Sequence, residues 1–190
     1  MTRKVSLAVL VVGFLVASSF VGTAAFTSAS VTRSSNVGVA ADNAAIIGLE
    51  AGSVEGVSED SDGKLDIDLG SGYGLNSGST FDYGDSSTVN SKETYAFIMT
   101  NNADSSIEFA VNYNSESDPA SSTTNLNFEF YSDDDSPLQD SSGSPIVITE
   151  DGSGQSFTLS SAQTVYVVIS VDTSGLAGGD SLSGDLEITA

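Results

Sequence analysis

Strict alternation of apolar and polar residues is the feature that most restricts what this chain can fold into. Between Lys64 and Leu69 every second residue is Leu or Ile, with Asp between them, and the same two-residue period returns in 107–113, 125–131 and 182–189. Such a period places the apolar side chains on one face of a β-strand. Beyond the first 25 residues no longer window shows the 3.6-residue apolar period of a helix. We therefore predict an all-β protein.

Further strands are predicted wherever β-branched and aromatic residues cluster between turn-forming residues. With the alternating runs they give a predicted strand set of 43–49, 64–69, 94–101, 107–113, 125–131, 146–149, 156–159, 164–171 and 182–189, with one more short strand in the Gly-rich loop 70–91. Antiparallel strands in such numbers, separated by turns, pack as a β-sandwich. We expect about nine or ten strands in one domain, residues 42–190.

Two finer expectations concern the order of these strands. Val165–Val171 is the most continuously apolar run and is predicted to be central in its sheet. The runs 94–101 and 107–113 are joined by a short Asn/Asp/Ser connection, which predicts a β-hairpin. The acidic, Gly-rich segment 52–63 is predicted to be a loop.

Composition excludes several classes of function. The chain has no Cys, and His and Trp are also absent, which removes His-dependent triads, thiolate sites and imidazole zinc sites. Its 26 acidic residues face only five basic ones. Nucleic acid is therefore excluded as a partner, because phosphates would meet no neutralising surface. Molar salt would screen the self-repulsion of such a chain.

The N-terminus has the order of a secretory signal peptide. Arg3 and Lys4 precede an apolar stretch from Val5 to Val16, and small residues lie before Ala25. We predict residues 1–24 to be a removable signal peptide, so that the membrane is met only transiently and the protein is secreted to the extracellular cell surface. A retained membrane anchor is the alternative, since the apolar run is about 20 residues long, enough to span a bilayer.

The junction that follows carries a family resemblance. A leader ending in Gly-Thr-Ala, then Ala-Phe and Ser/Thr-rich sequence, and a Gly-Leu-Glu-Ala-Gly element at 48–52 resemble the start of the TasA and camelysin group of exported fibre proteins. The chain is also similar to a haloarchaeal family of secreted proteins, through Ala24–Ser28, Arg33, Val37–Asp42 and Ile46–Glu50. Its Asp-rich, Lys-poor composition resembles that of halophilic secreted proteins. The motifs cover only about the first third of the chain.

The resemblance implies a jelly-roll or immunoglobulin-like β-sandwich and a mode of assembly. In fibres of the TasA kind, the N-terminal strand of one subunit completes the sheet of the next. The segment 25–41 would be that donor strand, with Phe26, Ala29, Val31, Val37 and Val39 as its groove-filling side chains and copies of the same chain as partners. These residues cannot all face inward, because the intervals between them are not all even. An edge strand folded back on its own domain is the alternative.

No catalytic residue is predicted. Gly179–Leu182 spells a lipase-like Gly-Asp-Ser-Leu, but no His exists to activate Ser181, and 172–175 lacks the second copy that an aspartic protease requires. A carboxylate-only glycosidase remains a remote alternative. No cofactor is required. Calcium is possible at Asp60, Asp62, Asp66 and Asp68, or at 133–135, through oxygen ligands. A monomeric surface module that binds sugar or calcium is the alternative function.

Overall fold

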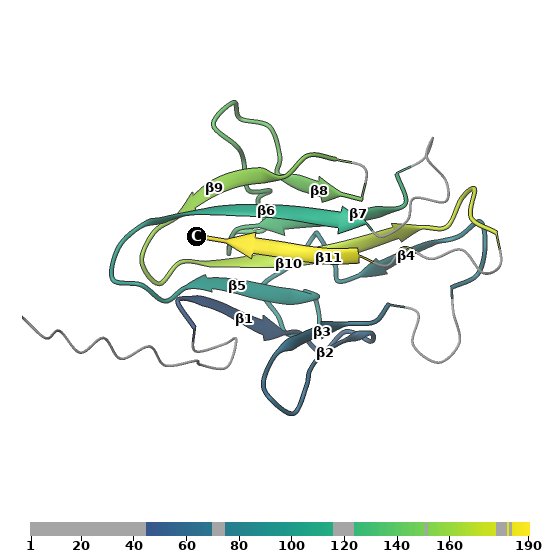
Figure 1. Cartoon of the computed structure of the whole chain (residues 1–190), viewed down its shortest axis with the longest axis horizontal. Helices are drawn as coiled ribbons and strands as arrows, with labels where there is room; N and C mark the ends of the chain where they lie inside the picture. The colour runs from purple at the N-terminus through teal and green to yellow at the C-terminus, as the bar shows by residue number, and fades with distance from the viewer. Residues whose placement is uncertain (1–44, 70–74, 116–123, 151, 178–181, 183) are drawn as a thin grey trace, which may run out of the picture. The chain divides into compact units, whose positions relative to one another are not determined.

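Antiparallel strands build the whole of the described structure, and none of its residues is helical (Figure 1). This computed structural model describes residues 45–69, 75–115, 124–150, 152–177, 182 and 184–190, which all lie in the unit Val39–Ala190. The eleven strands are β1 (Ile47–Ala51), β2 (Val57–Glu59), β3 (Leu65–Ile67), β4 (Thr80–Tyr83), β5 (Phe97–Asn101), β6 (Ile107–Ser115), β7 (Leu126–Tyr131), β8 (Val147–Thr149), β9 (Gln155–Leu159), β10 (Thr164–Asp172) and β11 (Gly184–Thr189). The all-β prediction is confirmed.

The larger sheet has six strands in the order β1-β5-β10-β7-β8, and β4 pairs with a different part of β10. β10 is central, as its apolar run predicts: Val167 lies opposite Phe97 of β5 on one side and opposite Phe130 of β7 on the other. Its nine residues are long enough to hold β5 at one end and β4 at the other on the same edge.

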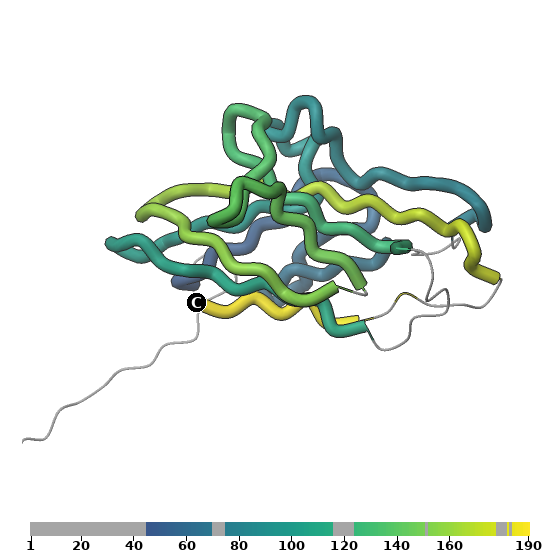
Figure 2. The backbone as a smooth tube through the Cα atoms, turned by 90° about the horizontal axis from the view of Figure 1, so that it is seen from above, coloured from purple at the N-terminus to yellow at the C-terminus, as the bar shows by residue number. Residues whose placement is uncertain are grey.

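The smaller sheet has the order β11-β6-β9 and lies as a second layer over the larger one (Figures 1 and 2). The alternating residues Phe109, Val111 and Tyr113 of β6 face the core, with Glu108 and Ala110 exposed on the other face. The core lies between the layers, and its largest fully buried side chains include Phe97, Met99, Phe109, Phe128, Phe130, Leu159 and Ile169. This is a β-sandwich.

The predicted hairpin between 94–101 and 107–113 is wrong. β5 pairs with β1 and β10 in the larger sheet, whereas β6 pairs with β11 and β9 in the smaller one, so residues 102–106 cross between layers. The buried Asn101 side chain holds this crossing: its Nδ2 lies 2.8 Å from the Ser105 carbonyl and 3.0 Å from that of Leu159, and its Oδ1 accepts the Ala103 N–H. The polar connection therefore marks a change of sheet.

The predicted loop 52–63 contains a strand, β2, which forms a two-stranded hairpin with β3. β2 has only three residues, and Val57 is the one that is buried. A strand this short shows no recognisable two-residue alternation in the sequence. The turn depends on local hydrogen bonds, in which an Asp60 carboxylate oxygen accepts the N–H groups of Asp62 and Lys64 at 2.8 and 3.0 Å. Gly63 in this turn has a φ of 73°, which a glycine adopts without strain.

A second, small apolar cluster lies on the outer face of the larger sheet. It consists of Val89, Tyr131 and Val168, with Tyr166 packed beside it. Two loops cover this face side by side (Figure 2), and the Val89 N–H donates to Asp135 Oδ1 at 2.8 Å to join them. The larger sheet is therefore covered on both faces near its centre, which fits the near-continuous apolar sequence of β10.

The predicted signal peptide, residues 1–24, and the predicted donor segment, residues 25–41, lie outside the described residues. Among the residues that are described, no helix has the length and apolar character needed to cross a membrane.

Candidate assembly site

The two lateral sides of the sandwich differ in how well they are closed. On the side where β8 faces β9, the inward side chains Ile146, Ile148 and Leu159 are each at most 1% exposed. Gln155 of β9 donates from Nε2 to the Val147 carbonyl of β8 at 3.0 Å, which ties the two sheets together there. This side, β8–β9, is sealed.

On the opposite side, where β1 and β11 end their sheets, the inward side chains are only partly buried. Ile47 and Leu49 of β1 and Leu186 and Ile188 of β11 pack against the core yet keep part of their surface exposed. In the view of Figure 1, β5 and β1 lie beyond β11, so the smaller sheet ends before the larger one. We call this the open side. The β2–β3 hairpin contributes Leu65 and Ile67, also half-buried, along part of it.

The outer edge of β1 turns backbone groups away from β5 that pair with no other described strand. Hydrogen bonds from Asn102 N to Ile46 O (3.0 Å) and from Gly52 N to Ala96 O (2.8 Å) flank the β1–β5 ladder. Because antiparallel pairs alternate, the even-numbered residues of β1 bond to β5, and Ile47 and Leu49 turn their N–H and C=O groups to the outer edge. β1 has no second partner strand within the described sheets. This is the geometry that accepts an added strand.

One carboxylate reaches this edge. The N–H of Ala51, the next outward-turned group, donates to Glu59 Oε1 of β2 at 3.3 Å. Nearby, Lys92 Nζ lies 2.8 Å from Glu50 Oε1, the one ion pair that the described residues form. The Glu50 contact also raises the pKa of Lys92. Glu50 is therefore paired with a cation, whereas Glu59 accepts a backbone amide and feels the charge of Lys92 without an ion-pair contact to it.

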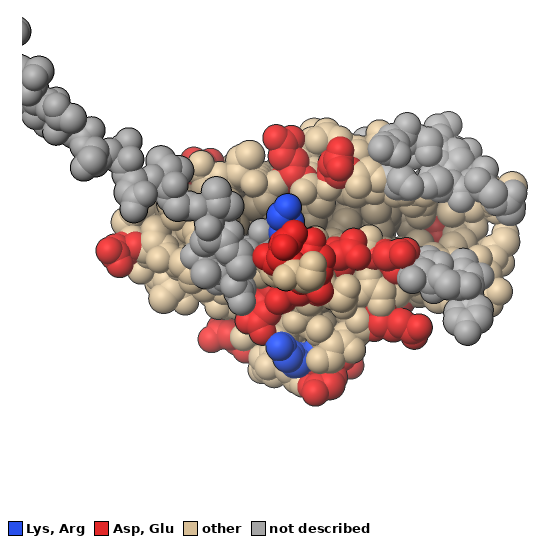
Figure 3. All heavy atoms as spheres, turned by 60° about the horizontal axis from the view of Figure 1, so that its bottom comes forward, with Lys and Arg blue, Asp and Glu red and all other residues tan. Residues whose placement is uncertain are grey.

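Acidic residues cover this part of the surface. Seven acids and one Lys fall between positions 50 and 68, on β1, β2, β3 and their connections. Figure 3, which brings the β1–β3 side forward, shows acidic side chains spread across it with basic groups among them. The open side therefore combines a half-exposed apolar strip with an acidic rim.

The structure does not assemble the predicted calcium ligands into a site. The Asp60 carboxylate accepts hydrogen bonds from the backbone N–H groups of Lys64 and Asp62 in the turn, and these hydrogen bonds lower the pKa of Asp60. Asp66 and Asp68 are exposed, on β3 and just beyond it. Throughout the described part of the chain, no three acidic side chains lie close enough together to hold a metal ion.

The other acidic motifs serve the backbone locally. Asp134 Oδ1 accepts the Ser132 hydroxyl at 2.6 Å and the Ser136 N–H at 3.2 Å, which lowers the pKa of Asp134. At 172–175, Asp172 Oδ1 accepts the Ser174 N–H at 2.8 Å in a turn, and Thr173 is buried. Ser181 lies outside the described residues.

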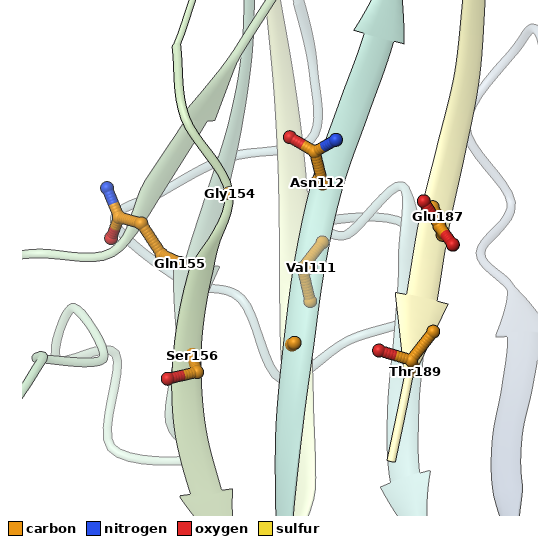
Figure 4. Close-up of a pocket in the computed structure, with 8 residues that line it drawn as sticks. Val111, Asn112, Gly154, Gln155, Ser156, Glu187 and Thr189 are labelled. Atoms are coloured by element: carbon orange, nitrogen blue, oxygen red, sulfur yellow. The ribbon is translucent and has the colours of Figure 1, made fainter.

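A shallow hollow of about 420 Å³ lies on the outer face of the smaller sheet (Figure 4). Its floor is made by small residues that align across three strands, since Thr189 lies opposite Ala110 and Ala110 opposite Ser156. The complete lining is Ala110, Val111, Asn112, Gly154, Gln155, Ser156, Glu187 and Thr189. Without an aromatic residue it offers no stacking platform, and Glu187 is its one charged group.

The open side was not visible in the sequence. The alternation of β11 predicts that Leu186 and Ile188 are inward, which is confirmed, but it does not predict that β11 is the last described strand at its edge of the sheet. Glu59 fell in a predicted loop and had no signal of its own. The predicted groove-filling residues, Phe26, Ala29, Val31, Val37 and Val39, lie outside the described residues. No family model, no curated protein and no solved structure matches this chain.

Proposed function

We propose that this protein is a secreted, non-enzymatic structural subunit of an extracellular fibre, pilus or surface layer. Its N-terminal segment, residues 25–41, would occupy the open side of the next copy as an added strand. The observation that carries the proposal is the asymmetry of the sandwich: one side is sealed by Ile148 and Leu159, and the other leaves Ile47 and Ile188 only partly buried beside an edge of β1 that no described strand pairs.

The physical gain from such an insertion has two parts. The added strand would bury the remaining apolar surface of β1 and β11, at about 25 cal/mol per Å². It would also pair the outward-turned backbone groups of Ile47 and Leu49. Residues 25–41 are small, β-branched and polar, and they contain no acidic residue. Val31, Val37 and Val39 all have odd numbers, so in an unbroken strand their side chains share one face.

Assembly is tested with the mature chain, residues 25–190, in molar salt, by light scattering and negative-stain electron microscopy. We expect fibres from this chain and none from the chain that lacks residues 25–39. A matched pair of substitutions keeps the full chain: Val31→Asp places a charge on the inward face, whereas Thr32→Asp adds the same charge on the other face. We expect Val31→Asp to prevent assembly and Thr32→Asp to permit it.

Monodisperse monomers of the mature chain in molar salt would overturn the proposal. The chain would then be better described as a monomeric surface-binding module, whose candidate surface is the hollow around Ala110 and Asn112.

A further inference from the structure

We infer that Glu59 on the open side is the docking partner of Arg33 from a second copy of this chain, and that this pair sets the position of the incoming segment. The inference rests on the proposed function and goes beyond it, because it names the acceptor edge, β1, and a pair of residues that specifies the partner.

The charges of the chain are divided unevenly along its length. Residues 25–41 contain Arg33 and no acidic residue, whereas residues 42–190 contain all 26 acids and only Lys64 and Lys92 as basic residues. The N-terminal segment is thus the one positively charged stretch of the mature chain. Because molar salt screens charges beyond about 3 Å, opposite charge on segment and surface acts at contact, where it disfavours wrong partners.

The two-residue period of a strand fixes where Arg33 must point. Arg33 has the same parity as Val31 and Val37, so in an unbroken strand the three side chains share one face. If the valines fill the apolar strip of the open side, the guanidinium is carried to its wall. A charge placed there without a partner is costly, so the docked segment needs a carboxylate at that point.

Glu59 is the carboxylate that lies at this point of the open side and forms no ion pair among the described residues. Its Oε1 already reaches the outer edge of β1, at the Ala51 N–H, 3.3 Å away. Glu59 pairs with Leu65 across the hairpin, and Leu65 packs against the core, so Glu59 lies on the side of the hairpin that faces the apolar strip. Glu50 is not equivalent, because Lys92 already pairs with it at 2.8 Å.

The same contact gives Glu59 two successive roles. In the free subunit Glu59 accepts the hydrogen bond of the Ala51 N–H, so this end of the β1 edge does not offer that amide to another strand. In the assembly, an incoming backbone carbonyl can take the Ala51 amide, and Glu59 is released to accept a bidentate pair from the Arg33 guanidinium. A bidentate pair favours one register of the segment over its neighbours, which would shift the arginine along the groove.

A charge swap in the mature chain tests the inference. We expect Arg33→Glu and Glu59→Arg each to slow assembly at least about tenfold, because each places like charges together at the interface. The chain that carries both substitutions should recover most of the wild-type rate. Glu59→Gln, which keeps an oxygen for the Ala51 amide, should lose less than Glu59→Arg. Asp66→Arg is the matched control, since Asp66 is an exposed acid on the same hairpin, and it should not slow assembly.

The absence of cysteine allows a second measurement. Arg33→Cys chains mixed with Glu59→Cys chains should form disulfide-linked heterodimers on oxidation, and Arg33→Cys mixed with Asp66→Cys should not.

If the wild type assembles but the double swap stays slow, or if Glu59→Arg behaves like Asp66→Arg, the Arg33–Glu59 pair is wrong while the proposed function stands. A disulfide within one chain carrying both Cys substitutions, without links between chains, would show the segment folded back on its own domain. A wild-type chain that never assembles overturns the proposed function and this pair with it.

Discussion

The sealed and open sides of this sandwich are built from the same kind of strand but end in different states. β9 and β11 are the two edge strands of the smaller sheet, and both alternate polar with apolar residues. Leu159 of β9 is completely buried in the core, whereas Ile188 of β11 is only partly buried at an edge that no described strand continues. The comparison shows that alternation determines which face of a strand turns inward, while the burial that results depends on the neighbours.

The largest expected effect comes from matched truncations on the two sides. Ile148→Ala, on the sealed side, should lower the free energy of unfolding by about 3–5 kcal/mol, because a fully buried side chain leaves a cavity. Ile188→Ala, on the open side, should cost about 1–2 kcal/mol, since solvent already reaches part of that side chain. Urea unfolding of both variants in molar salt measures the difference. Equal losses would mean that the β11 side is packed as tightly as the β8 side.

Two neighbouring asparagines extend the comparison to polar contacts. Asn101→Ala should destabilise the fold by about 2–3 kcal/mol, since the carbonyls of Ser105 and Leu159 and the Ala103 amide would lose a buried partner. The Asn102 side chain is exposed and donates from Nδ2 to the Ala45 carbonyl beside the open side. Asn102→Ala should therefore destabilise the fold by less than about 1 kcal/mol. Thermal unfolding followed by circular dichroism ranks the two. A larger loss for Asn102→Ala would contradict the assigned role of Asn101.

Alkaline pH probes the covered outer face of the larger sheet. Burial and the hydrogen bond donated to Glu129 raise the pKa of Tyr131 to about 12. The neutral phenol therefore contributes fully to stability below about pH 10, the ordinary tyrosine pKa, and this contribution is lost as the pH rises toward 12. The melting temperature should fall over that range, and less steeply in Tyr131→Phe.

The tyrosinate absorbance of the native chain gives the matching titration. Burial raises the pKa values of Tyr83 and Tyr95 in the same direction, so Tyr131→Phe should remove only part of the high-pH step. If Tyr131→Phe instead removed absorbance from the step near pH 10 and left the high-pH step unchanged, the raised pKa of Tyr131 would be wrong.

The smallest effect is expected at the open side's ion pair. Lys92→Ala breaks an exposed contact with Glu50, so in molar salt it should leave the free energy of unfolding nearly unchanged. A clear loss of stability would show that the acidic rim needs Lys92 for folding and would lower the weight given to assembly contacts there. Denaturant unfolding at low and at molar salt separates the two cases.

Much of the fold follows from residue pattern alone. The faces of β3, β6, β7 and β11, the central place of β10 and the all-β class were predictable, because a period of two and a continuous apolar run each have one simple structural solution. The connection 102–106 was misassigned as a hairpin turn. Its composition suits a tight turn and a crossing between sheets equally well, and the buried contacts of Asn101 with Leu159 and Ser105 decide between them.

By itself, therefore, the sequence determined the secondary structure class, the inward face of each long strand, and the division between a weakly basic N-terminal segment and an acidic domain. The tertiary structure decided that β8 seals one side, that β1 and β11 leave the other open, and that Glu59 reaches the β1 edge. These depend on which strands become neighbours. Sequence periods act along one strand, whereas pairing, closure and the position of a side chain at an edge arise between segments far apart in the chain.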